Sequence, residues 1–110
     1  MSTVKKYLKT KVKVTFEVAK EAALGAKEVY LLCDFNGWDP IPLVASKAKK
    51  KEGSYSLSID LPIPQETKAF QYRFRFVMPD GSEKYDNDWN AEKYCPNPFG
   101  GENSVFTVVA

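Results

Sequence analysis

Apolar and polar side chains alternate along most of the chain, which is the pattern of β-strands that bury one face. Residues 11–18 and 54–61 each carry an apolar side chain at every second position. Residues 68–78 continue the pattern over a longer run, with aromatic side chains on one face. The strands that we expect are 11–18, 28–33, 54–61, 68–78, 82–86 and 103–109, with a shorter one at 43–45.

The segments between these strands contain residues that end regular structure. Residues 34–41 hold an Asn-Gly and an Asp-Pro dipeptide, and the Pro-Asp-Gly of residues 79–81 predicts a hairpin turn. Residues 19–27 are short and contain a glycine, so we expect a connection that carries a turn of helix. Residues 88–102 are rich in Asn, Pro and Gly and are expected to be irregular.

Six to eight short strands without a convincing helix predict an all-β protein, an antiparallel β-sandwich of the immunoglobulin-like form. A chain of 110 residues has room for one domain. We assign residues 11–110 to this domain and residues 1–10 to an N-terminal tail.

The composition argues against several classes of protein. The chain has no histidine, which excludes a Ser-His-Asp triad, a Cys-His pair and His-ligated zinc. The net charge of +2 is too small to indicate nucleic-acid binding, and only two of the basic residues are arginines. No apolar run reaches the roughly 18 residues of a membrane span, and residues 1–11 lack the apolar centre of a signal peptide.

Two cysteines, Cys33 and Cys95, are the only residues that could form a disulfide. Small disulfide-stabilised domains carry more cysteines than this. We therefore interpret both as free, buried thiols and place the protein in the cytoplasm.

The acidic residues do not indicate an active site. A glycosidase needs two carboxylates about 5–10 Å apart, one of them with a raised pKa. Asp86, Asp88 and Glu92 are close enough in the sequence for an acid pair or a calcium site, but an exposed acidic loop is the favoured interpretation. We therefore expect no catalytic residues, no metal and no cofactor.

Aromatic residues in predicted loops are the unusual feature of this chain. Trp38 lies in the turn after the second strand, and Tyr85, Trp89, Tyr94 and Phe99 occur within the last third. An exposed flat ring suits the apolar face of a sugar, although Trp38 would equally serve to cap the open end of the sandwich. We interpret Tyr94 as folded back onto the sandwich, whereas Trp89 fits either role.

Three segments resemble one family. Residues 29–38 (VYLLCDFNGW) resemble the strand and loop of the glycogen- and starch-binding modules of branching enzymes, isoamylases and the β subunit of AMP-activated protein kinase. Residues 74–81 are similar to the family's aromatic-basic-aromatic strand and Asp-Gly hairpin, and residues 87–105 to the end of small bacterial isoamylase early-set domains. The resemblance extends over residues 11–109 and implies an early-set immunoglobulin-like sandwich.

The resemblance also implies binding residues. Trp38 corresponds to the first stacking tryptophan, and Arg75 to the basic residue that reaches sugar hydroxyls. The second stacking position falls on Tyr85 when counted back from the Asn-Asp pair, and on Glu83 when counted forward from the Asp-Gly turn.

Further along, the resemblance places two more residues at the sugar. Phe99 takes the place of an apolar residue that lies against the ring, and Asn103 either bonds the sugar or holds its loop. Gly101 and Ser104 stand where the family has hydroxyl-bonding Thr and Asn, which weakens that part of the site.

The favoured hypothesis is a non-catalytic module that binds an α-glucan such as glycogen, starch or a maltooligosaccharide. The resemblance makes a glycogen-metabolising enzyme a candidate partner. The alternative is a protein-interaction or regulatory domain with a vestigial sugar site. Catalysis by the chain itself is not expected, because the family's catalytic barrel needs about 250 residues.

Overall fold

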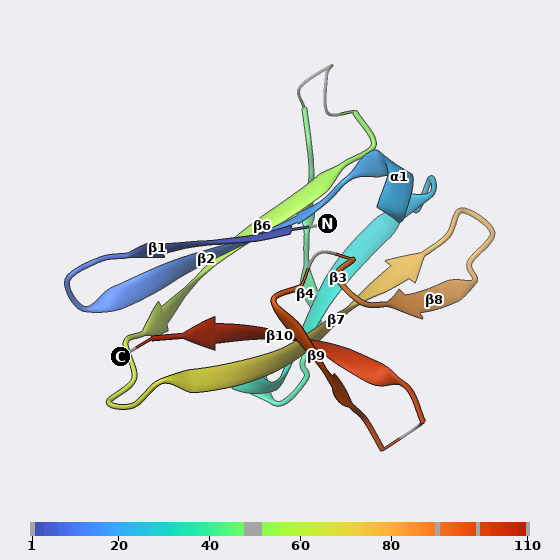
Figure 1. Cartoon of the computed structure of the whole chain (residues 1–110). Helices are drawn as coiled ribbons and strands as arrows, with labels where there is room; N and C mark the ends of the chain where they lie inside the picture. The colour runs from blue at the N-terminus through green and yellow to red at the C-terminus, as the bar shows by residue number, and fades with distance from the viewer. Residues whose placement is uncertain (1, 48–51, 90, 99, 110) are drawn as a thin grey trace.

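The computed structural model describes residues 2–47, 52–89, 91–98 and 100–109. They form two antiparallel sheets that enclose an apolar core between them (Figure 1). The helices in the described part are short, namely α1 (Lys20–Ala23), in the connection where a helical turn was expected, and the 3-10 helix η1 (Asp34–Asn36). None of the described helices is long and apolar enough to cross a membrane.

The first sheet has the strand order β1-β2-β6-β5. Strand β2 pairs along its whole length with β6, and its apolar positions all face inward and are fully buried. This arrangement follows directly from the period-two pattern, because alternate side chains of a strand point to opposite faces. The strands are β1 (Ser2–Tyr7), β2 (Lys11–Val18), β5 (Val44–Ala45) and β6 (Tyr55–Pro62).

The second sheet has the order β4-β3-β7-β10-β9, and β8 also pairs with β7. Strand β7 is the longest and lies at the centre, where it contacts β3, β8 and β10. Figure 1 shows β7 and β10 crossing beneath the first sheet. The strands are β3 (Glu28–Cys33), β4 (Ile41–Pro42), β7 (Lys68–Val77), β8 (Glu83–Asp86), β9 (Lys93–Pro96) and β10 (Glu102–Val108).

Aromatic rings join the two sheets. Phe16 of β2 makes edge contacts with Tyr72 and Phe74 of β7, at centroid distances of 5.3 and 6.4 Å, and with Phe106 of β10 at 5.7 Å. All four side chains are fully buried. The aromatic face predicted for residues 68–78 therefore packs into the core between the two sheets. The all-β prediction is confirmed.

Residues 1–10 were expected to be a tail, but residues 2–7 form β1, which pairs with β2. Polar contacts from the side of β1 that faces the second sheet hold it there. Thr3 Oγ1 donates a hydrogen bond to Asp88 Oδ2 (3.1 Å), and Lys5 Nζ donates one to the Thr107 carbonyl (2.8 Å). Because these partners are remote in the sequence, the local pattern gave no sign of them.

The segment 88–102, expected to be irregular, contains β9. This four-residue strand lies at the edge of the second sheet and pairs with β10, with Cys95 opposite Asn103. Two prolines and a glycine-rich turn around a short edge strand hide the alternation on which the sequence prediction relied.

Both cysteines are free thiols, as predicted. Cys33 is fully buried, whereas Cys95 is only half-buried. Burial raises the pKa of the Cys33 thiol to about 12, so this side chain stays protonated at neutral pH.

We therefore expect iodoacetamide at pH 8 to label native protein at Cys95 and to spare Cys33. The thiolate is the reactive form, and Cys33 forms very little of it. Peptide mass spectrometry measures the labelling of each cysteine. The control is the same reaction in about 6 M guanidinium chloride, a concentration that unfolds even very stable proteins, so both cysteines should then be labelled. Equal labelling of the two cysteines in native protein would contradict the buried position of Cys33.

Candidate functional site

Strand β7 changes its hydrogen-bonded partner halfway along. Its pairing with β10 ends at Tyr72, and its pairing with β8 begins at Phe74. Arg73 lies between the two, while on its other side it is opposite Leu32 of β3. Strands β8 and β10 therefore part at Arg73, whose side chain belongs to the face of the sheet turned away from the core.

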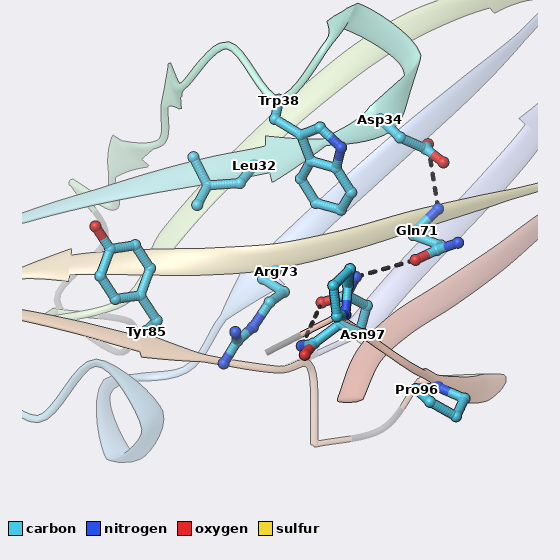
Figure 2. A pocket seen from close by; sticks show the side chains of 10 residues that line it. Leu32, Asp34, Trp38, Gln71, Arg73, Tyr85, Pro96 and Asn97 are labelled. Atoms are coloured by element: carbon cyan, nitrogen blue, oxygen red, sulfur yellow. Dashed lines mark hydrogen bonds between the residues drawn. The ribbon is translucent and has the colours of Figure 1, made fainter. Parts of the chain in front are cut away.

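A pocket of about 740 Å³ opens on this outer face. Its volume falls within the range of about 300–1,000 Å³ that is usual for small-molecule sites. Figure 2 shows its walls, which come from β3, β7, β8, the loop after β3, and the ends of β9 and β10 with the turn between them. The lining residues are Leu32, Asp34, Trp38, Gln71, Arg73, Tyr85, Pro96, Asn97, Pro98 and Asn103.

The loop after β3 holds Trp38 at the pocket. Gly37 and Trp38 both adopt left-handed backbone, with φ of 72° and 69°. This conformation is easy for glycine but costs a bulky residue about 1–3 kcal/mol. The Trp38 N–H donates to the Cys33 carbonyl (2.9 Å), and Asp34 Oδ1 accepts from the Gln71 N–H (3.2 Å). These bonds tie the loop to β3 and β7 and stabilise the strained turn.

Trp38 is 40% exposed, so it is not a buried cap of the sandwich. Its indole lies at the pocket, above β7 in the view of Figure 2.

Tyr85 provides a second ring at the same pocket. It is opposite Arg75 in the β7–β8 register and is 52% exposed. Its hydroxyl donates to Glu83 Oε2 (3.2 Å). Of the two residues that the sequence left open for the second stacking position, Tyr85 lines the pocket, and Glu83 is not among the described lining residues.

A chain of amide side chains forms the floor near β10. Asn103 Nδ2 donates to Gln71 Oε1 (3.0 Å), and Asn97 Nδ2 donates to Asn103 Oδ1 (3.3 Å). Asn103 is 6% exposed and connects β7 to the turn between β9 and β10. Of the two roles open for Asn103, these contacts favour holding the loop.

The two arginines of β7 have different environments. Arg75 forms an ion pair with Glu83 (Nε–Oε2 2.9 Å), and its guanidinium lies over the Tyr30 ring, 5.4 Å from the centroid. Arg75, predicted to reach the sugar, is outside the set of described lining residues, and Arg73 occupies the pocket instead. Both side chains point outward, so alternation alone could not choose between them.

The predicted exposed acidic loop is wrong for Asp88. Its side chain is fully buried and accepts hydrogen bonds from the hydroxyls of Tyr72 (2.6 Å) and Thr3 (3.1 Å). Asp86 accepts from an indole N–H, and Glu92 pairs with a lysine. Within the described ranges, no group of three or more His, Cys, Asp or Glu side chains is arranged to hold a metal ion.

The other three aromatic residues considered from the sequence, Tyr94, Trp89 and Phe99, have different outcomes. Tyr94 donates from its hydroxyl to the Asp88 carbonyl, as expected for a side chain folded back onto the sandwich. Trp89 is 53% exposed, donates to Asp86 Oδ2 (2.9 Å) and is not one of the described lining residues. Phe99 lies outside the residues that the structure describes.

Sequence reasoning did not include Leu32, Gln71, Arg73 or Asn97 among the site residues. The outward position of Gln71 and Arg73 beside Trp38 depends on strand pairing, which a single sequence does not reveal. The Asn-Pro sequence of the turn between β9 and β10 was the one signal that pointed toward Asn97.

No protein-family model and no curated protein sequence matches the chain. The geometry of the pocket and the chemistry of its residues are therefore the basis for a functional assignment.

Proposed function

We propose that this protein is a non-catalytic α-glucan-binding module, for glycogen, starch or maltooligosaccharides. The observation that carries the proposal is the meeting of Trp38 and Tyr85 at one pocket, with amide and guanidinium groups between them. The resemblance of residues 29–38, 74–81 and 87–105 to glycogen- and starch-binding modules supports it, and the two antiparallel sheets are consistent with the early-set immunoglobulin-like sandwich that this resemblance implies.

The chemistry of a glucose ring fits these side chains. Its axial C–H groups form an apolar face that stacks on an aromatic ring, and its equatorial hydroxyls both donate and accept hydrogen bonds. Trp38 supplies the larger stacking surface, while Gln71, Asn97 and Arg73 supply polar groups at the floor. The strained backbone at Trp38 supports a binding role, because such strain collects at functional sites.

We expect Trp38→Ala to weaken maltoheptaose binding by about 1–3 kcal/mol, judged from the comparable stacking of bases, or roughly 5- to 150-fold. Calorimetry and tryptophan fluorescence measure the affinity. Trp89→Ala is the matched control, because it removes an exposed tryptophan that is not among the described lining residues of the pocket. Trp89→Phe leaves Trp38 as the single tryptophan of the sequence, so a change in tryptophan fluorescence on addition of sugar then reports on Trp38.

Unchanged binding in Trp38→Ala would show that this pocket is not the glucan site. Folded wild-type protein that does not bind at millimolar sugar would contradict the function itself. In that case the alternative, a docking domain for a glycogen-metabolising enzyme or another partner, becomes the better hypothesis. The cytoplasm is the proposed compartment, because Cys33 and Cys95 are free thiols.

A further inference from the structure

Arg73 is the basic side chain of the pocket and has no anionic partner among the described residues. Its Nε, like that of Arg75, is shielded from solvent and has no hydrogen-bond partner among the described residues, so the two arginines differ in the ion pair that Arg75 makes with Glu83. A guanidinium is always charged at neutral pH and presents its donors in a planar fork. A guanidinium that lines a pocket and has no anionic partner among the described residues favours an anion supplied from outside the chain.

The nearby carboxylates are held by other donors. Asp34 Oδ1 accepts the Gln71 backbone N–H (3.2 Å), and Glu83 pairs with Arg75 (2.9 Å). Asp86 accepts an indole N–H (2.9 Å). The contrast between Arg73 and Arg75 is informative, because the two lie on the same face of one strand and Arg75 alone has an acidic partner.

We propose that the pocket recognises a glucose unit that carries an anionic substituent, a phosphate ester or a carboxylate, and that Arg73 binds this anion. The inference rests on the proposed glucan-binding function and specifies its ligand. A neutral hydroxyl accepts one hydrogen bond from a guanidinium, whereas phosphate and carboxylate oxygens accept two parallel ones and balance its charge. An anionic sugar therefore gains more from Arg73 than a neutral sugar does.

The pocket places Arg73 apart from its carboxylate, Asp34. In the view of Figure 2, the Arg73 guanidinium lies between Tyr85 and Asn97, and Asp34 lies on the other side, beside Gln71. A ring stacked on Trp38 would place one edge toward Arg73 and the other toward Asp34. The anion belongs on the Arg73 side, where repulsion from the Asp34 carboxylate is weakest.

The test compares three ligands by calorimetry: maltoheptaose, maltoheptaose with one phosphate ester at a C6 position, and the corresponding C6 carboxylate. We expect at least one anionic ligand to bind wild-type protein about tenfold or more tightly than the neutral sugar. The anionic ligand that shows this gain tells whether the pocket recognises a phosphate ester or a carboxylate. Inorganic phosphate alone is expected to bind far more weakly, because it lacks the stacked ring.

Arg73→Gln, which removes the charge but keeps donors, is expected to weaken both kinds of ligand and to reduce the ratio of anionic to neutral affinity to about one. Arg73→Lys should keep part of this gain in affinity for the anionic sugar, because the positive charge remains although the planar pair of guanidinium donors is lost. Arg75→Gln is the matched control on the same strand and should retain the gain in full.

Equal binding of neutral and anionic sugars by wild type would overturn the anion inference and leave the glucan function standing. A gain that survives Arg73→Gln, or that inorganic phosphate alone reproduces, would also overturn it. No binding of any sugar would overturn both proposals.

Discussion

Replacement of Phe16 by alanine is expected to lower the free energy of unfolding by about 3–5 kcal/mol, the usual cost of a large cavity in a core. Phe16 is fully buried and is the ring of the first sheet that contacts Tyr72, Phe74 and Phe106 of the second. Loss of the Phe16 ring removes the aromatic contacts that join the two sheets at this point of the core. Urea unfolding followed by circular dichroism measures the change.

The matched control is Val4→Ala on β1, where the side chain is 58% exposed. An exposed substitution of this kind usually changes stability by less than about 0.5 kcal/mol. Because single domains are stable by only about 5–15 kcal/mol, Phe16→Ala should remove a large part of the total. A loss below about 1 kcal/mol would be incompatible with a ring that fills the space between two sheets.

Asp88→Ala is expected to destabilise the protein by about 3 kcal/mol, because it removes the carboxylate acceptor shared by the buried Tyr72 hydroxyl and the half-buried Thr3 hydroxyl. The carboxyl group accepts from Tyr72 and Thr3, and the Asp88 N–H donates to Ser104 Oγ (2.8 Å). One residue thus connects β1, β7 and β10. Burial, and secondly the bond to Asp88, raises the pKa of the Tyr72 hydroxyl far above its ordinary value.

A double-mutant cycle separates this network from simple loss of packing. Tyr72→Phe should cost less in the Asp88→Ala background than in wild type, because the shared hydrogen bond is already gone. Asp60→Ala is the control, since Asp60 is half exposed and pairs with Lys11 at 3.4 Å on the surface. Additive effects of the two core substitutions would mean that the Tyr72–Asp88 bond contributes nothing.

The buried network also supports the pocket. Asn87, next to Asp88, accepts the Ser104 N–H at Oδ1 (3.0 Å) and donates from Nδ2 to the Glu102 carbonyl (2.7 Å). The Asn87 side chain therefore bonds the edge of β10 just after β8 ends. This contact places β8, and with it Tyr85, beside the pocket.

The sequence by itself determined the two-sheet architecture and placed Trp38 in the turn after β3, without deciding whether that ring caps the sandwich or faces a ligand. Alternation is a local property, so it showed which face of β2 and β7 is buried without any knowledge of their partners. Turn residues are local as well, and the Asn-Gly turn put Trp38 outside the core. Tyr85 could be named only as one of two candidates, because the length of the hairpin before it was ambiguous.

Only the tertiary structure decided which polar residues share the site and which are buried. Arg73 and Arg75 have the same local pattern, and their difference arises from where β7 exchanges β10 for β8. Asp88 looked like a surface residue because its partners lie on β1 and β7. Strand pairing and buried hydrogen bonds join residues that are distant in the chain, and local patterning does not encode those distances.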